Sequence, residues 1–523
     1  MSAVRNVLFV MCDQLRRDFV SCYGSSPVAT PGIDRLAARG IRFDNAFVQS
    51  GVCGPSRMSF YTGRYVASHG ATWNRVPLSA AEWTLGDYLR AAGRTAALCG
   101  KTHVLPDDEA LARFGIEIES ERGALLREGG FVIVDRYDGH TPPSLESGYA
   151  DWLRARGYEG ADPWTDYVIA VEDRGRVASG WSLRNVHLPA RVKEEHSETA
   201  YMTDLALDWI RARGASPWVL HLSYVKPHWP YVAPAPFHRK YRGKPIGTIL
   251  HGPQDGTAAE HPVVRAYRSH DECRSFGREE VARHVRPAYM GLVAQVDHHL
   301  ARLVDALVAL GRLDDTLIVF ASDHGEFLGD RGLGEKELFY DEVVRIPMIV
   351  VDPDARADAT RGTADARFVE GVDVVPTVLG ALGLPPSAHR VEGRSLLPLT
   401  RGGSADAGAW RDAAFCELDY GFRRARLTLG RGVRECRAQM VRTAQWKYVH
   451  WEGFRPQLFD LAADPRELSD LGADPRFSAE RAALRERLFD WLSTRARRTT
   501  VSDALVEART DAHRRHGIDI GIW

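Results

Sequence analysis

Short apolar segments that end in polar residues recur along this chain and alternate with stretches of helical periodicity. The clearest of these segments are residues 7–11, 95–99, 218–225 and 317–321. Such an alternation is typical of a mainly parallel sheet that is covered by helices on both faces. The sequence therefore predicts an α/β fold with a large central sheet.

Polar residues follow each of these four apolar segments. They are Asp13-Gln14, Gly100-Lys101-Thr102-His103, Lys226-Pro227-His228 and Ser322-Asp323-His324-Gly325. In open α/β sheets, ligands bind in the crevice beyond the carboxyl ends of the strands. We expect the four strand ends to bring their side chains to one edge of the sheet.

Helical intervals and composition changes predict how the rest of the chain is organised. Residues 288–310 place leucines and valines on one stripe, and residues 83–92 form a second helix closed by Gly93. Residues 106–195 and 239–286 are rich in charge, glycine and proline, and we interpret them as insertions that shape a substrate cleft.

The composition turns small and polar at residues 400–408, which predicts a domain boundary. Residues 1–400 would then form the catalytic domain, and residues 401–523 a smaller carboxyl-terminal α+β subdomain with a short antiparallel sheet and a tail. Strand-like residues 447–451 and helical residues 479–492 support that division. The tail from 495 to 523 lacks a core pattern, so we expect it to pack on a neighbouring subunit of a dimer or tetramer.

The charge balance and the cysteine pattern exclude several classes of protein. The 523 residues carry 68 Lys and Arg against 69 Asp and Glu, so no global field would gather nucleic acid or an acidic membrane. No uncharged apolar run is long enough to cross a bilayer, and residues 6–11 read as a core strand rather than a signal peptide. Seven widely scattered cysteines, an odd number, indicate a cytoplasmic protein without structural disulfides.

The most specific motif is Cys53-Gly54-Pro55-Ser56-Arg57. Pro55 suits the first turn of a helix and Gly63 would end that helix, so Cys53 is expected at a helix N-terminus, where free N–H groups favour an anion. A lone cysteine is more often a buried structural residue. The residues around Cys53 favour a functional role instead.

These residues resemble the sulfatase family, which shares the alkaline-phosphatase-type fold. In that family Cys-x-Pro-x-Arg is read by a maturation enzyme that oxidises the cysteine to formylglycine, and Cys53, Pro55 and Arg57 match it. The hydrated aldehyde carries two hydroxyls on one carbon. One attacks the sulfur or phosphorus, and the other then expels the bound group, which is a form of nucleophilic catalysis.

The nucleophile needs a metal ion, and the strand ends supply ligands for one. Asp13, Asp323 and His324 form a hard oxygen set with one imidazole, Gln14 adds an amide oxygen, and the modified Cys53 completes the set. Such ligands suit one Ca²⁺, Mg²⁺ or Mn²⁺ ion. The cation would lower the pKa of the attacking hydroxyl and neutralise the ester oxygens.

The resemblance extends to an anion pocket. Lys101 and His103 match the Gly-Lys-x-His motif, His228 matches the Pro-His-x-Pro element, and Lys336 matches a lysine downstream of Asp-His-Gly. The resemblance implies that Arg57 supports the formylglycine and that Asn74 contacts the anion. It also implies that either His228 or Lys336 protonates the departing alcohol.

Three segments resemble a subgroup of phosphonate monoester hydrolases and related arylsulfatases. Asp13-Gln14 stands where many relatives carry Asp-Asp, and residues 74–78 and 221–224 resemble that subgroup. The neutral amide of Gln14 should weaken Ca²⁺ binding and favour Mn²⁺. Phosphonate hydrolases of the subgroup tend to carry Tyr and Thr where this chain has Lys101 and His103, which favours sulfate esters as substrates.

Several functions stay open on the sequence. The first is hydrolysis of sulfate monoesters, as in arylsulfatases, and the second is hydrolysis of phosphonate monoesters or phosphodiesters at the same site. A third is a non-catalytic anion-binding protein that never modifies Cys53. A serine nucleophile, Ser56 or Ser59, is a weaker rival because neither lies at the start of the helix. Trp73, Trp229 and Tyr231 could stack on an aryl alcohol.

Overall fold

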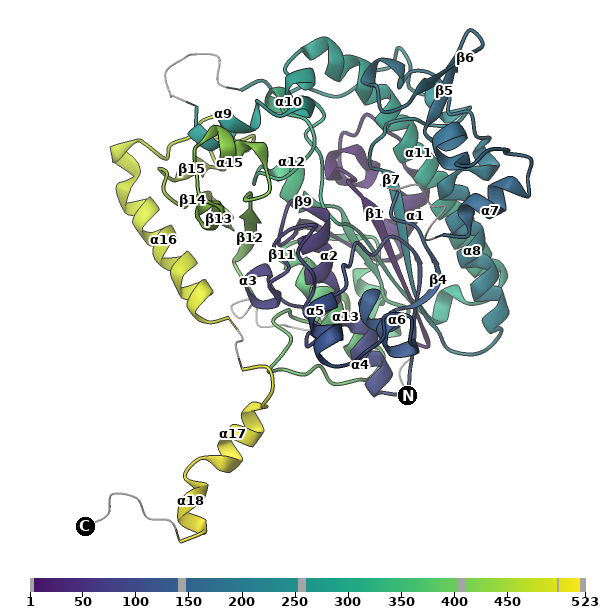
Figure 1. The fold of residues 1–523 in the computed structure, drawn as a ribbon. Helices are drawn as coiled ribbons and strands as arrows, with labels where there is room; N and C mark the ends of the chain where they lie inside the picture. Colours follow the sequence, from purple (N-terminus) through teal and green to yellow (C-terminus); the bar gives the residue numbers. More distant parts are fainter. Residues whose placement is uncertain (1–3, 140–146, 253–259, 403–409, 496–497, 518–523) are drawn as a thin grey trace.

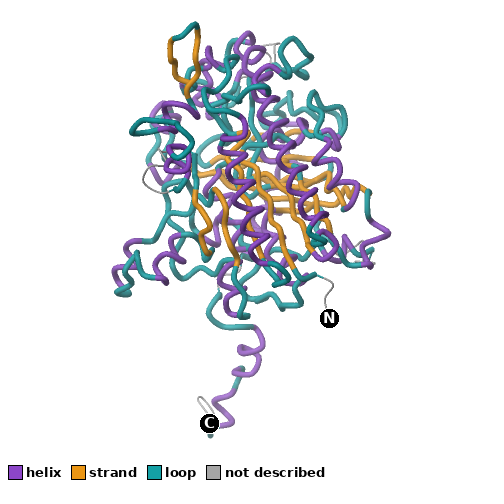
Figure 2. Tube along the Cα trace, turned by 90° about the vertical axis from the view of Figure 1, so that its right-hand side faces the viewer, coloured by secondary structure: helices purple, strands orange, loops and turns teal. Residues whose placement is uncertain are grey.

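The computed structural model describes residues 4–139, 147–252, 260–402, 410–495 and 498–517. A large sheet lies in the middle of the molecule with helices around it, and a smaller sheet lies beside it (Figures 1 and 2). None of the helices in these ranges combines the length and the apolar character needed to cross a membrane.

Strand β1 (Asn6–Asp13) lies in the middle of the large sheet and is buried along its whole length. Its alternate side chains enter two different apolar cores, Val7 and Phe9 on one face and Leu8 and Val10 on the other. Because side chains alternate along a strand, both faces of the sheet must be covered. The predicted covered sheet is therefore confirmed.

Within the described residues the large sheet has nine strands in the order β11-β2-β10-β8-β1-β7-β3-β4, with β9 beside β2. Only β9 and β10 pair antiparallel with their neighbours, so the sheet is mainly parallel, as predicted. The other strands are β2 (Ile41–Phe47), β3 (Ala96–Gly100), β4 (Val132–Arg136), β7 (Val219–Pro227), β8 (Thr316–Ser322), β9 (Arg345–Ile346), β10 (Met348–Val351) and β11 (Thr363–Glu370).

Two groups of helices cover the two faces of this sheet. On the face of Leu8 lie α1 (Pro31–Arg39), α8 (Glu198–Arg213) and α11 (Glu279–Ala309). On the face of Val7 lie α2 (Cys53–Thr62), α4 (Leu85–Ala91) and α13 (Val374–Ala381). The shorter helices are α3 (Val66–His69), α5 (Asp108–Arg113), α6 (Glu121–Arg127), α7 (Tyr149–Arg154), α9 (Pro262–Tyr267), α10 (Asp271–Phe276), α12 (Asp341–Val344), α14 (Leu397–Thr400) and α15 (Arg424–Thr428).

The structure moves the start of both predicted helices. Helix α11 begins at Glu279, ahead of the predicted 288, and passes through Pro287 because Ala282 and Val285 before the proline are buried. Helix α4 begins at Leu85 because Thr84 and Asp87 form a capping box there. Apolar burial and capping, rather than the apolar stripe alone, set these boundaries.

The segments predicted as insertions also contribute to the main body. Strand β4 lies within residues 106–195 and pairs in parallel with β3 at the edge of the large sheet. The same segment holds a two-stranded hairpin of β5 (Ala170–Asp173) and β6 (Arg176–Ser179). Residues 239–286 include α9, α10 and the first turns of α11.

The carboxyl-terminal part forms the predicted short antiparallel sheet. Its strands are β12 (Ala413–Asp419), β13 (Arg437–Thr443), β14 (Trp446–Trp451) and β15 (Gln457–Asp460), and α16 (Ser478–Ser493) packs on it. Apolar residues of β12 and β13 belong to the same core as residues of β2, so the two sheets share a core. Most of the predicted boundary at 400–408 lies outside the described residues.

The tail beyond α16 projects from the body as α17 (Asp503–Arg509) and α18 (Ala512–Arg515) (Figure 1). Helix α17 buries none of its side chains. Packing of this tail on a neighbouring subunit stays a prediction.

Candidate active site

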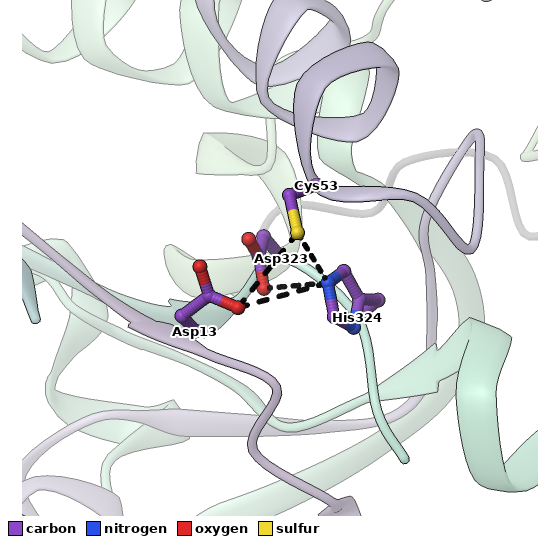
Figure 3. Close-up of side chains that lie close together, drawn as sticks. All are labelled: Asp13, Cys53, Asp323 and His324. Carbon is purple, nitrogen blue, oxygen red and sulfur yellow. Dashed lines mark hydrogen bonds and ion pairs between the residues drawn. The ribbon is translucent and has the colours of Figure 1, made fainter. Parts of the chain in front are cut away.

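The carboxyl ends of four neighbouring strands meet at one edge of the large sheet. Strands β8, β1, β7 and β3 are adjacent in that order. Asp13 is the last residue of β1, and Asp323 and His324 follow directly after β8. Helix α2 begins at Cys53 beside them (Figure 3). The structure thus joins two strand ends and one helix start that are far apart in sequence.

Asp13, Cys53, Asp323 and His324 form a compact cluster, which we call the site cluster. One potential ligand atom from each residue lies within 4.8 Å of the others, and all four side chains are buried. The Cys53 Sγ lies 3.1 Å from His324 Nε2 and 3.9 Å from Asp13 Oδ1. His324 Nε2 in turn lies 3.7 Å from Asp13 Oδ1 and 3.6 Å from Asp323 Oδ1.

The orientation of His324 determines what the site cluster can bind. Its Nδ1 lies 2.8 Å from the carbonyl oxygen of Gly325, which can only accept, so Nδ1 carries the proton. Burial lowers the pKa of His324, which leaves the ring neutral at pH 7 and gives Nε2 a lone pair. This lone pair faces the carboxylates of Asp13 and Asp323. Three electron-pair donors that face one another are the ligand set of a hard divalent cation.

Helix α2 is held against the site cluster at its first turn. Asn74 Oδ1 accepts the N–H of Gly54 at 2.7 Å, and Ser56 Oγ donates to the carbonyl oxygen of Asp323 at 2.5 Å. The helix ends at Gly63, which adopts φ 68° as a left-handed C-cap. The predicted helix from Cys53 is confirmed in its bounds, and its N-terminus points at the site.

Two buried cations hold the carboxylates of the site cluster. Arg57 donates to Asp323 Oδ2 at 2.8 Å and to Asp13 Oδ2 at 3.1 Å, and Lys101 Nζ lies 2.7 Å from Asp13 Oδ2. Arg57 is anchored in turn by Ser223 Oγ at 2.8 Å. Arg57 therefore orients both carboxylates from the side away from His324.

The charges of these groups shift the pKa values in the site. Burial alone would raise the pKa of Asp13, but the charges of Lys101 and Arg57 hold it well below its usual range. Burial and the negative charge of Asp13 raise the pKa of the Cys53 thiol to about 11. An unmodified Cys53 is consequently protonated at pH 7 and a weak nucleophile.

A second set of predicted residues is connected by hydrogen bonds beside the site cluster. Lys336 Nζ lies 3.1 Å from Gln14 Oε1 and 3.1 Å from His228 Nε2. The amide nitrogen of Gln14 donates to Tyr231 Oη at 3.3 Å and, in a short contact, to Glu326. Burial and the charge of Glu335 raise the pKa of Glu326 to about 8.

An open cleft of about 860 Å³ leads to these groups. His103 is half-buried in its wall, where its backbone N–H donates to Asp138 Oδ1 at 3.4 Å. Asn74, His228 and Lys336 also line it. Two aromatic pairs stand at its walls, Trp181 with Trp229 at 5.0 Å between ring centroids and Trp73 with Phe422 at 5.9 Å.

Backbone strain concentrates around the cleft. Among the described residues nine non-glycine residues have positive φ, and four of these belong to the site or its walls. They are Gln14 at 68°, His103 at 58°, Glu335 at 65° and Glu337 at 88°. Each such residue costs about 1–3 kcal/mol and persists only where the surroundings hold it, which is common at functional sites.

The structure also brings in residues that the sequence prediction did not assign. Ser223 anchors Arg57, and Glu326 contacts Gln14. Glu326 follows the pattern that identified the other residues, since it lies two residues after His324, whereas Ser223 is the fifth of nine residues in β7 and lies in register with Gly100 at the end of β3. Their side-chain partners could not be read from that pattern.

Comparisons with known proteins place the chain in a family. The sulfatase family model matches residues 5–384, and the model described as N-sulphoglucosamine sulphohydrolase, C-terminal, matches residues 329–494. The multifunctional alkaline phosphatase superfamily protein PehA of Trinickia caryophylli is 32% identical, over 95% of this chain and 96% of that protein.

Two solved structures share the fold. The phosphonate monoester hydrolase of Agrobacterium radiobacter aligns with a TM-score of 0.79 and 29% identity, over 94% of this chain and 95% of that one. The phosphonate monoester hydrolase SpPMH of Silicibacter pomeroyi aligns with a TM-score of 0.82 and 29% identity, over 94% and 96% of the two chains. The predicted alkaline-phosphatase-like fold is confirmed.

Proposed function

This chain belongs to the sulfatase family, and from that premise we propose that it hydrolyses sulfate monoesters with a formylglycine made from Cys53 beside one divalent metal ion. The observation that carries the proposal is the convergence of Asp13 Oδ1, Asp323 Oδ1 and His324 Nε2 at the N-terminus of α2. A nucleophile at residue 53 would lie among these three atoms, next to Val52 in the lining of the cleft.

The donor set fits a divalent cation. Asp13, Asp323 and His324, together with the oxygen of the modified residue 53, would hold Ca²⁺, Mn²⁺ or Mg²⁺, and Gln14 is predicted to add its amide oxygen. When bound, the cation would lower the pKa of the attacking hydroxyl and neutralise charge on the ester oxygens.

The residues of the chain would position and stabilise the reacting groups. Arg57 and Lys101 keep the carboxylate of Asp13 ionised, so that it can bind a cation rather than a proton. The N–H groups at the start of α2 favour an anion at residue 53. Asn74 occupies the N–H of Gly54, so we propose that it shapes the helix start as well as contacting the anion.

Lys336 and His228 would supply the proton for the departing alcohol. His228 Nδ1 lies 2.6 Å from the carbonyl oxygen of Trp229, so its Nε2 is free of a proton and accepts from Lys336. One proton of the Lys336 ammonium therefore lies between Nζ and His228 Nε2, next to the cleft. We propose that this pair is the general acid, with Lys336 as the initial proton donor.

Hydrolysis of phosphonate monoesters or phosphodiesters at the same site is a second candidate. The two solved structures at 29% identity are phosphonate monoester hydrolases, which favours this reading. The nucleophile and the metal ligands would be the same in both reactions. A promiscuous enzyme that accepts both anions is consistent with the similar size and charge of a sulfate and a phosphonate ester.

A substrate panel ranks the two reactions. We expect kcat/KM to be larger for para-nitrophenyl sulfate than for para-nitrophenyl phenylphosphonate, measured on the Mn²⁺-loaded protein. A larger value for the phosphonate ester would reverse the ranking and support the second candidate. No turnover of either ester would contradict the proposed function.

The mass of the tryptic peptide that spans residues 43–57 tests the modification. We expect an aldehyde in place of the Cys53 thiol when the protein is expressed with the formylglycine-generating enzyme. An unmodified thiol under those conditions would support the anion-binding alternative.

The remaining predictions on cellular context belong to the same proposal. All seven cysteines lie within the described residues and are free thiols, which supports the predicted cytoplasmic location. A dimer or tetramer formed through the tail after α16 stays a prediction.

A further inference from the structure

The backbone of Gln14 is held on both of its polar groups. Its backbone adopts φ 68°, its N–H donates to Asp323 Oδ1 at 3.0 Å, and its carbonyl oxygen accepts from Tyr289 at 2.7 Å. The strained backbone fixes the direction in which the side chain leaves the chain. Only the amide group itself is left to be oriented.

The neighbours of Gln14 determine which amide atom faces which way. Lys336 can only donate, so the amide atom that lies 3.1 Å from its Nζ must be the oxygen. The NH₂ group then points in the opposite direction, where Glu326 and Tyr231 lie. Donor chemistry alone therefore assigns the two atoms of the amide.

Glu326 is fixed more firmly than its partner. It is completely buried, its Oε1 accepts the N–H of Leu328 at 3.0 Å, and its own N–H donates to the Glu342 carbonyl oxygen at 3.2 Å. Gly325 before it packs so closely that an added Cβ would lie 1.9 Å from that same oxygen. Glu326 is therefore held in place, and its Oε2 can accept from the amide of Gln14 in either protonation state of the carboxyl group.

We propose that Glu326 is a positioning residue that fixes the Gln14 amide with its oxygen toward Lys336 and the site cluster. Without this acceptor, the amide can flip and present NH₂ to the Lys336 ammonium and to the cation, and both contacts become repulsive. The role rests on the proposed function, because it matters through the cation that Gln14 is predicted to bind. Gln14 stands where many relatives carry a second aspartate. A fixed amide oxygen at this position would partly replace the missing carboxylate as a metal ligand.

The variant Glu326→Gln tests this role, because it keeps the size of the side chain but can turn its own NH₂ toward Gln14. We expect Mn²⁺ affinity, measured by titration calorimetry on metal-free protein, to fall by about 10-fold to 100-fold, the usual cost of losing a partner behind a metal ligand. In a Gln14→Ala background the same substitution should leave the affinity unchanged. Glu326→Asp, which keeps a carboxyl group as the acceptor, should recover part of the loss.

A second buried Gln–Glu pair provides the matched control. Gln49 donates to Glu370 at 3.4 Å, and both residues are completely buried outside the cleft. Glu370→Gln should leave Mn²⁺ affinity unchanged, with folding followed for every variant by circular dichroism. An equal loss of affinity in the presence and absence of Gln14, or no loss in Glu326→Gln, would overturn the proposal. The readout of this experiment is metal binding. Inactivity toward all esters would therefore contradict the proposed function but would not test the role of Glu326.

Discussion

Two clusters, one at the edge of the large sheet and one beside the small sheet, each place carboxylates against a buried lysine or arginine. The second, which we call the interface cluster, consists of Lys447, Asp341 and Glu467. Lys447 on β14 donates to Asp341 Oδ1 at 2.5 Å and to the carbonyl oxygen of Phe339 at 2.8 Å, and it pairs with Glu467. It connects the small sheet to α12.

Perturbed pKa values do not separate the two clusters. The charges of Lys447 and Arg442 lower the pKa of Asp341, much as Lys101 and Arg57 lower that of Asp13. The geometry does separate them. The interface cluster places an ammonium among its acceptors, whereas the acceptor atoms of the site cluster face one another. Convergent ligand atoms, rather than buried charge, thus indicate the functional site.

Removal of the nucleophile should give the largest difference between the two clusters. We expect Cys53→Ala to lower kcat by at least about 10³-fold, since loss of a covalent nucleophile removes the whole pathway. Thermal unfolding should change little. Cys99→Ala removes another completely buried thiol, on β3, and should retain activity. Comparable turnover in the two variants would refute the role of Cys53.

The interface cluster should respond in the opposite way. Lys447→Met removes the ammonium that pairs with Asp341 and with the buried Glu467, which should lower the free energy of unfolding by about 3–5 kcal/mol. The folded protein should keep its kcat. Urea titration and the ester assay check the two halves of this prediction. If Lys447→Met kept the wild-type free energy of unfolding but lost turnover, the interface cluster would have a catalytic role and the prediction would be wrong.

The same Asp→Asn substitution in each cluster should affect metal binding differently. Asp323→Asn should weaken Mn²⁺ binding by at least about 100-fold, the upper cost of losing an outer partner, whereas Asp341→Asn should not change it. Removal of the metal with a chelator should abolish turnover, and added Mn²⁺ should restore it. Calorimetric titration with Mn²⁺ measures the affinity of both variants. Equal affinities would contradict the assignment of Asp323 as a metal ligand.

The smallest expected effect concerns the start of α2. Asn74→Ala leaves the Gly54 N–H without its acceptor and should cost about 0.5–2 kcal/mol of stability, the range for a lost helix cap. If Asn74 also contacts the anion, KM should rise. A loss of stability with unchanged KM would limit Asn74 to a structural role.

The sequence predicted the parts of the fold and site that depend on local patterns. The apolar runs identify β1, β3, β7 and β8 because the centre of a covered sheet is apolar. Strand β4 was missed because Val132 and Ile133 at the sheet edge are exposed and the strand carries charge. An edge strand has no such pattern to read.

The side-chain contacts between distant segments could not be predicted in the same way. Gln14 and Glu326 are 312 residues apart, and their pairing depends on how β1 and β8 align and on the strained backbone at Gln14. The same holds for the approach of Arg57 to both carboxylates. Residue types and strand ends predict which residues lie at a site, but not which of their atoms are in contact.

Crystals grown with Mn²⁺ and measured at its absorption edge would test the account most directly. We predict one anomalous peak within bonding distance of Asp13, Asp323 and His324, next to an oxygen on residue 53 where the thiol sulfur would otherwise lie. A peak at another place, or these side chains turned away from one another with no ion between them, would contradict it.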